Sequence, residues 1–178
     1  MRQKYHKIYE AGLTARIDPF VFWDLKRSGA CDDEICKILR IDVDLAGFKQ
    51  YKRDNIETWD FLKFDRLIDG VENKLARLSL KRPLCILTVR KNRDNLIEQL
   101  HSLGIARYFD NILSPRAEMF ELPGCEQKIA LLAESYPCVS GVMIGDSEAD
   151  VGCAREADLL MFSVLSGLRN FAYLKNLQ

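Results

Sequence analysis

Four polar side chains stand at points of the chain where the pattern of strands and helices predicts that they meet. Asp146 and Asp150 follow the apolar run of residues 139–144, and Thr88 ends an earlier apolar run. Lys128 lies near the start of a predicted helix. The carboxyl ends of parallel strands gather at one edge of a sheet, where ligands bind in folds of this class. We therefore expect a hydroxyl, an ammonium and two carboxylates to share one site.

This combination of groups suits a phosphorylated ligand and Mg²⁺. A hydroxyl and backbone amides donate to phosphoryl oxygens, a lysine offsets their charge, and paired carboxylates hold a hard cation. Plainer interpretations exist: Thr88 as an ordinary strand end, Lys128 as a solvated helix lysine, and Asp146 and Asp150 as helix caps, since Asp is favourable at a helix start. The glycine before Asp146 and the order of the segments favour the site.

Strands alternate with helices in the second half of the chain. Apolar runs predict strands over residues 84–88, 112–113, 139–144 and 159–164, and helical spacing predicts helices over residues 92–103, 125–135 and 146–157. Short strands that alternate with helices of about ten residues are typical of βαβ units. The predicted fold class is therefore α/β, with a Rossmann-like parallel sheet as its core.

The first 80 residues have a helical pattern instead. Helix starts are predicted at Asp18, where Pro follows, at Asp32 and at Asp69, because an acceptor side chain favours the first turn of a helix. A more polar helix is expected over residues 44–56. We predict two regions, an α-helical cap over residues 1–68 and an α/β core over residues 69–178.

Composition and charge exclude several classes of protein. The 178 residues are 48% hydrophobic and carry 26 basic and 26 acidic side chains, so the net charge is zero. Intrinsic disorder is excluded, no basic stripe marks a nucleic-acid binder, and no apolar run reaches the roughly 18 residues of a membrane helix. The six cysteines lack the two-residue spacing of zinc or redox motifs. We expect reduced thiols in a cytoplasmic protein that binds neither nucleic acid nor membranes.

Three stretches of the sequence resemble motifs of the haloacid dehalogenase superfamily, most of whose members are phosphatases. Thr88 in LCILT resembles the second motif, and Lys128 in GCEQKIALL resembles the third. The run VMIGDSEADVGCAREAD resembles the fourth, with Asp146 and Asp150 as its acidic pair. The early helices resemble the cap that this family inserts after its first motif. The resemblance covers the whole chain and implies a Mg²⁺-dependent phosphatase for a small phosphorylated molecule. Thr88 and Lys128 would be its catalytic residues, and the two aspartates its metal ligands.

The first motif of that family has no counterpart in the 178 residues. In the family it is an apolar strand ending in Asp-x-Asp-Gly-Thr/Val, whose first Asp is the nucleophile and whose second is the general acid and base. Asp18 and Asp24 follow no strand, so neither is assigned as nucleophile. The resemblance places the missing strand at the centre of the sheet, between the strands that end at Thr88 and Asp146. We expect an N-terminally truncated polypeptide that is inactive as this chain, through a misplaced start codon or a truncated gene.

Other outcomes stay open at this stage. The two strands beside the gap could close up, or a partner could fill it, including a second copy that pairs through the unpaired edges. The chain could be a non-catalytic phosphate- or Mg²⁺-binding module, or an assembly module; a flavodoxin-like sheet is a weaker structural alternative. Arg90 is a further candidate for substrate contact, and Arg116 competes with Lys128 for its role. Sugar phosphates, nucleotides, phosphoglycolate and phospholipid head groups are all compatible substrates.

Overall fold

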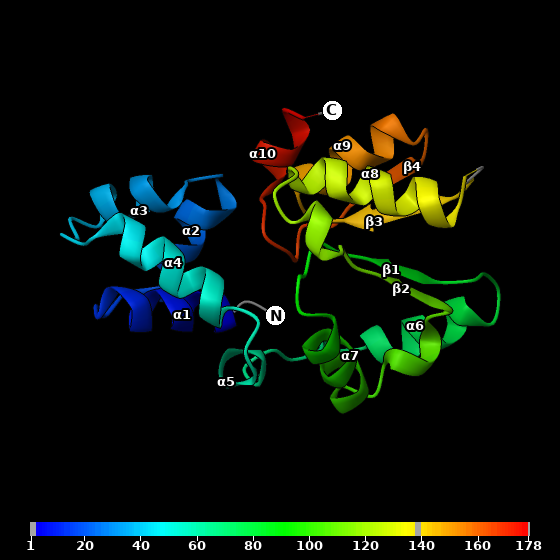
Figure 1. Ribbon diagram of the computed structural model, residues 1–178, viewed down its shortest axis with the longest axis horizontal. Helices are drawn as coiled ribbons and strands as arrows, with labels where there is room; N and C mark the ends of the chain where they lie inside the picture. The colour runs from blue at the N-terminus through cyan, green and yellow to red at the C-terminus, as the bar shows by residue number, and fades with distance from the viewer. Residues whose placement is uncertain (1–2, 138–139, 178) are drawn as a thin grey trace.

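A computed structural model describes residues 3–137 and 140–177 and shows an α/β protein with a helical region at its N-terminus (Figure 1). The helical region, residues 3–62, contains α1 (Gln3–Leu13), α2 (Pro19–Arg27), α3 (Asp32–Ile38), α4 (Leu45–Asn55) and α5 (Trp59–Leu62). The remaining elements are α6 (Val71–Ser79), β1 (Cys85–Leu87), α7 (Arg93–Ser102), β2 (Asn111–Leu113), α8 (Gly124–Ser135), β3 (Val142–Gly145), α9 (Glu148–Glu156), β4 (Leu160–Ser163) and α10 (Phe171–Lys175), with 3-10 helices at Ala106–Tyr108 and Ala117–Met119. The alternation of strands and helices confirms the predicted fold class. Cys138 and Val139, the latter expected at the start of a strand, lie outside the described residues.

Local side-chain signals set most helix starts where the sequence predicts them. Asp18 caps α2 by accepting hydrogen bonds from the backbone N–H groups two and three residues on, and Asp44 caps α4 by accepting from the N–H of Ala46. The expectation for Asp32 is wrong, because Cys31 takes the capping position and Asp32 is the first residue inside α3. The expectation for Asp69 is also wrong, because Gly70 occupies the capping position of α6, with a positive φ of 72°.

The side chain of Asp32 is buried in the helical region instead of capping a helix. It is 8% exposed and accepts hydrogen bonds from the hydroxyl of Tyr9 and from the ammonium groups of Lys26 and Lys52. The Tyr9 ring packs edge-to-face against Phe22, with a centroid distance of 4.8 Å. A charged network thus lies directly against the apolar core of the helices.

Replacing Asp32 with asparagine is expected to lower the free energy of unfolding at pH 7 by about 1–2 kcal/mol. Burial alone would raise the pKa of Asp32, but the hydrogen bonds from Lys52 and Tyr9 outweigh it and hold the pKa at about 2 instead of 3.8. A depressed pKa stabilises the folded state above about pH 4, and that contribution is lost as the pH falls towards 2. Urea denaturation at pH 7 and pH 3 measures both effects.

The neighbouring Asp33 supplies the control for this prediction. Its ion pair with Lys49 is exposed on both sides, so Asp33→Asn should change stability by less than about 0.5 kcal/mol. The difference between the wild type and Asp32→Asn should shrink at pH 3. A difference that stays constant with pH would contradict the role assigned to the ionised carboxylate.

The described strands form two separate two-stranded sheets. β1 pairs in parallel with β2, with Ile86 opposite Ile112, and β3 pairs in parallel with β4, with Met143 opposite Met161. β1 and β3 do not pair with each other within the described part of the chain. Figure 1 shows α8 and α9 on one side of the strands and α6 and α7 on the other. The alternative in which the two strands close up is therefore wrong.

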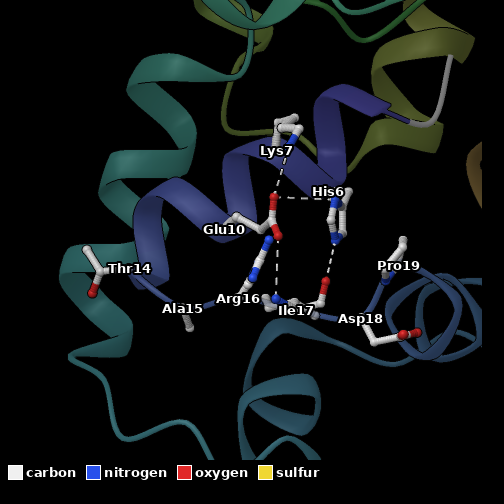
Figure 2. Close-up of a pocket in the computed structure, with 9 residues that line it drawn as sticks. All are labelled: His6, Lys7, Glu10, Thr14, Ala15, Arg16, Ile17, Asp18 and Pro19. Carbon is white, nitrogen blue, oxygen red and sulfur yellow. Dashed lines mark hydrogen bonds and ion pairs between the residues drawn. The ribbon is translucent and has the colours of Figure 1, made fainter.

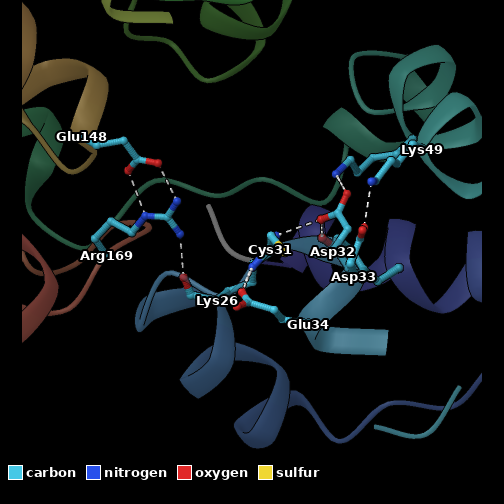
Figure 3. A network of polar contacts seen from close by, with 10 residues as sticks. Lys26, Cys31, Asp32, Asp33, Glu34, Lys49, Glu148 and Arg169 are labelled. Atoms are coloured by element: carbon cyan, nitrogen blue, oxygen red, sulfur yellow. Dashed lines mark hydrogen bonds and ion pairs between the residues drawn. The ribbon is translucent and has the colours of Figure 1, made fainter. Parts of the chain in front are cut away.

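Arg169 ties the helical region to the α/β part. Its guanidinium donates to the backbone carbonyl of Lys26 at 2.7 Å, at the end of α2, and forms an ion pair with Glu148 at 2.7 Å, at the start of α9 (Figure 3). The N–H of Asn170 also donates to the carbonyl of Arg27 at 2.9 Å. The loop after β4 thereby fixes α2. The boundary predicted at residues 68 and 69 stays a prediction, although the two apolar clusters draw on residues 5–61 and 67–112.

The five described cysteines are all free thiols, and two of them, Cys36 and Cys153, are buried. Burial raises the pKa of the Cys153 thiol to about 11, so it stays protonated at neutral pH. Across residues 3–137 and 140–177, no helix combines the length and apolar character needed to cross a bilayer.

Candidate functional site

Lys128 and Asp150 form a buried ion pair between α8 and α9. Their exposed fractions are 7% and 6%, and the ammonium donates to Oδ1 of the carboxylate. The other oxygen, Oδ2, accepts from the N–H groups of Asp146 and Ser147, each at 3.0 Å, and from the Ser147 hydroxyl at 2.6 Å. Burial alone would raise the pKa of Asp150, but the neighbouring Lys128 and these donors hold it below its usual value. Both carboxylate oxygens are therefore in use.

Asp150 holds the turn that follows β3. Its bonds to the two backbone N–H groups fix the segment in which Asp146 projects, and they require a very close approach at Gly145. A Cβ atom built on Gly145 would lie 2.3 Å from Cγ of Asp150, so a larger residue does not fit there without movement. The glycine before Asp146, singled out in the sequence, is thus explained by packing.

Asp146 presents a carboxylate that is only partly engaged. Its Oδ2 accepts from the backbone N–H of Leu168 at 2.5 Å, in the loop after β4. Its Oδ1 has no hydrogen-bond partner among the described residues, and the side chain is half-buried. The charge of Asp146 also reaches Tyr5, where it adds to the effect of burial in raising the pKa of the phenol. This is the one acidic group of the predicted pair with an oxygen left for a ligand.

Thr88 lies at the carboxyl end of β1, as predicted. Its N–H donates to the carbonyl of Leu113 at 3.0 Å, and its hydroxyl oxygen accepts from the N–H of Arg90 at 3.3 Å. The Cβ position of Gly124, the first residue of α8, is 3.5 Å from both Cγ1 of Val89 and Cβ of Ala149. The carboxyl ends of β1 and β3 therefore converge on the amino ends of α8 and α9, which favour anions.

Arg90 belongs to a buried cluster that the sequence analysis missed. Asp65 is 6% exposed, and its Oδ2 lies 3.5 Å from both the Arg90 guanidinium and the Lys4 ammonium. Gln99 donates to the same oxygen at 3.1 Å. Burial, aided by the Arg90 charge, lowers the pKa of Lys4 to about 8. These residues come from distant segments with no shared spacing, so no sequence signal could have grouped them.

Arg116, the other candidate cation, is on the surface. It pairs with Glu118 at 2.7 Å and with Glu134 at 2.8 Å, and more than half of its side chain is exposed. Its guanidinium is thus committed to exposed carboxylates, whereas Lys128 is buried beside Asp150. The structure places Lys128, Asp150 and Asp146 together, with Thr88 at the neighbouring strand end.

A groove of about 910 Å³ runs between the two half-sheets. We call it the inter-strand groove; its lining includes residues 83–87 of the β1 segment, residues 140–144 of the β3 segment, Leu75 and Leu78 of α6, and Lys128, Leu132 and Ser135 of α8, together with Asp150. A second hollow, of about 670 Å³, lies against α1 and the loop that follows it (Figure 2). Its lining comes only from residues 6–19, and none of the predicted site residues is among them.

Residues 32–164 match the family model of the haloacid dehalogenase-like hydrolases. The chain belongs to the haloacid dehalogenase-like hydrolase family. Solved structures of other proteins share the fold of this haloacid dehalogenase-like chain. A "predicted phosphatase" from Clostridium acetobutylicum aligns with a TM-score of 0.73 and 22% identity over 99% of this chain and 83% of that chain. A haloacid dehalogenase-like family hydrolase from Streptococcus pneumoniae aligns with a TM-score of 0.63 and 17% identity over 99% and 82%.

A "predicted phosphoglycolate phosphatase" from Haemophilus somnus also has this haloacid dehalogenase-like fold, with a TM-score of 0.63 and 17% identity over 96% of this chain and 80% of that chain. No curated protein shows a sequence match. Identities at this level establish the fold of the chain, and the chemistry has to be argued from its own residues.

Mg²⁺ fits this site through Asp146. In the described part of the chain, no three His, Cys, Asp or Glu side chains gather as a metal site. Mg²⁺, however, needs only one or two carboxylates when phosphate oxygens and water complete its shell. Asp146 has a carboxylate oxygen available for the metal, whereas Asp150 could bind it only after its ion pair with Lys128 is broken. Coordination by Asp150 stays a prediction.

Proposed function

We propose that this haloacid dehalogenase-like chain carries the phosphate- and Mg²⁺-binding part of a phosphatase site for a small phosphorylated molecule. We further propose that the 178 residues alone have little or no phosphatase activity. The observation that carries the proposal is the convergence of Thr88, Lys128 and Asp146 where β1 and β3 end, beside the amino ends of two helices. Family membership and solved structures that are described as phosphatases support it.

Each residue has a distinct role in this proposal. The Thr88 hydroxyl and the N–H groups at the start of α8 donate to phosphoryl oxygens, and Lys128 offsets their negative charge. Asp146 holds Mg²⁺, which when bound neutralises charge on the phosphoryl group. Asp150 is a positioning residue, because it fixes both the Lys128 ammonium and the backbone of Asp146.

No strand of the described residues ends in Asp-x-Asp, since Asp42 and Asp44 lie in the loop between α3 and α4, and this is why we expect no turnover. Phosphoryl transfer through an aspartyl nucleophile needs a carboxylate that attacks phosphorus. Asp150 is bound to Lys128, and Asp146 is assigned to Mg²⁺, so neither is assigned as the nucleophile in this proposal. The helical region is assigned the role of a cap that selects the substrate. Free thiols fit a cytoplasmic location.

Calorimetric titration with inorganic phosphate, with and without Mg²⁺, tests the binding part of the proposal. We expect saturable binding that Mg²⁺ strengthens. Asp146→Asn should abolish the effect of Mg²⁺, and Thr88→Val should weaken phosphate binding by about tenfold through the loss of one hydrogen bond to a charged group. Arg116→Ala is the matched control, because this exposed arginine lies outside the site.

Two results would count against the proposal. Phosphate binding that is unchanged in both Asp146→Asn and Thr88→Val would remove the site. Mg²⁺-dependent hydrolysis of para-nitrophenyl phosphate by the 178-residue chain, lost in Asp146→Asn, would refute its expected inactivity.

A further inference from the structure

The loop after β4, residues 164–170, contacts the carboxylate of Asp146 at its centre. The backbone N–H of Leu168 donates to Oδ2 of that carboxylate at 2.5 Å. A Cβ atom built on Gly167 would overlap the Asp146 side chain, so only glycine fits at this position without movement. The loop therefore sets the orientation of the carboxylate, whereas the turn after β3 carries the backbone of Asp146.

The same loop is attached to the end of α2 on both sides of this contact. Towards the start of the loop, the carbonyl of Leu165 accepts from the Arg27 guanidinium at 2.6 Å. At the end of the loop, the N–H of Asn170 donates to the carbonyl of Arg27 at 2.9 Å. The Arg169 guanidinium donates to the carbonyl of Lys26 at 2.7 Å. The centre of the loop is thus held between two attachments to the helical region.

Arg169 connects the end of the loop to both parts of the chain, as Figure 3 shows. Besides its bond to the Lys26 carbonyl, its guanidinium forms two hydrogen bonds with the Glu148 carboxylate, at 2.9 and 2.7 Å. The side chain is 11% exposed, and a bidentate pair of this kind has a well-defined geometry. Glu148 begins α9 only two residues after Asp146. A shift of α2 would therefore reach the segment that carries Asp146.

We propose that the loop after β4 couples the position of α2 to the carboxylate of Asp146. The bonds made by Arg27 and Arg169 hold the centre of the loop against Asp146 and so keep its Oδ1 oriented for Mg²⁺. Both arginines are positioning residues, because they act through the loop on a metal ligand. Coupling between two sites is reciprocal, so Mg²⁺ on Asp146 would in turn stabilise the attachment of α2. The role of Mg²⁺ rests on the proposed function, whereas the link between Asp146 and α2 does not.

Hydrogen exchange of the full chain in EDTA tests the link without any metal. Asp146→Ala removes the acceptor of the Leu168 N–H, whereas Asp146→Asn keeps a carbonyl oxygen that can take its place. The probes are the hydrogen-bonded amides at the end of α2, in Ser28, Gly29 and Ala30. They should exchange about threefold faster, or more, in Asp146→Ala than in the wild type and in Asp146→Asn. The amides of α4 should not change. Equal exchange of the probes in all three chains would overturn the coupling.

Calorimetric titration with Mg²⁺ tests the coupling in the other direction. Arg27→Met removes a bond to the loop from a residue of α2, and Gly167→Ala displaces the centre of the loop from Asp146. Each change should weaken Mg²⁺ binding by about fivefold or more, and Arg27→Lys, which keeps a donor, should restore most of the affinity. Lys49→Met is the matched control, because this exposed lysine of α4 pairs with Asp33 within the helical region.

The two experiments separate this inference from the proposed function. A wild-type chain that binds no Mg²⁺ would overturn the proposed function together with the metal-orienting role of the loop, and the exchange experiment would still decide the link to α2. Mg²⁺ binding that is normal in the wild type and unchanged in both Arg27→Met and Gly167→Ala would overturn the coupling alone. Equal weakening by Lys49→Met would also overturn it, since the effect would then not pass through the loop.

Discussion

Replacing Asp150 with alanine is expected to destabilise the protein by about 3–5 kcal/mol, because the buried ammonium of Lys128 would lose its carboxylate. The change also leaves three donors in the turn after β3 without their acceptor, the N–H groups of residues 146 and 147 and the Ser147 hydroxyl. Urea denaturation at pH 7 measures the loss.

Lys128→Met should cost less, about 2–3 kcal/mol, since Asp150 would keep those three donors. The double variant Lys128→Met/Asp150→Ala should therefore lose less than the sum of the single losses, with a coupling of about 1–3 kcal/mol. Arg116→Met is the control, because its exposed pair with Glu134 should contribute less than about 1 kcal/mol. Strictly additive losses for Lys128 and Asp150 would show that the two side chains do not form a stabilising pair.

The fold could be predicted because its signals are local. Alternating apolar runs and helices, and capping residues such as Asp18 and Asp44, act within a few residues of the elements they define. The error at Asp32 has a different origin. Its burial against Lys26 and Lys52 depends on how α2, α3 and α4 pack, which no local pattern reveals.

The candidate site shows the same division between local and long-range information. The sequence correctly places Thr88 at a strand end and Asp146 in the turn after another strand. It does not show that Asp150 is held by Lys128, 22 residues away on another helix, or that Arg90 joins Asp65 and Gln99. Those partners are chosen by tertiary packing, which the spacing of residues along the chain does not reveal.

The gap in the sheet could be predicted, but whether the two strands beside it close up or stay apart could not. The resemblance locates a missing strand between those that end at Thr88 and Asp146, and that leaves both closure and an open groove possible. The structure decides between them, since side chains of α6 and α8 line the space between β1 and β3. Apolar side chains of both helices therefore line the open groove.

A peptide that fills the inter-strand groove and ends in Asp-x-Asp is expected to give the chain phosphatase activity. A strand parallel to β1 and β3 would bring its carboxyl end to the side where Thr88, Lys128 and Asp146 lie. Its first aspartate would form a bond to phosphorus as the bond from phosphorus to the leaving oxygen breaks, and its second would protonate that oxygen. Water would then release phosphate from the phosphoaspartyl group. Hydrolysis of para-nitrophenyl phosphate with Mg²⁺ should rise by about 10³-fold or more at saturating peptide.

Two controls separate peptide binding from the chemistry. The peptide with Asn in place of its first Asp should bind as tightly and give no turnover, because an amide does not attack phosphorus. The Asp146→Asn chain should also bind the peptide, yet stay inactive with Mg²⁺, since the substituted side chain lies beyond the groove lining. Binding of the Asp-x-Asp peptide without turnover would refute the phosphatase proposal and leave a non-catalytic phosphate-binding module as the better description. Failure of every such peptide to bind would instead contradict the expected position of the missing strand between β1 and β3.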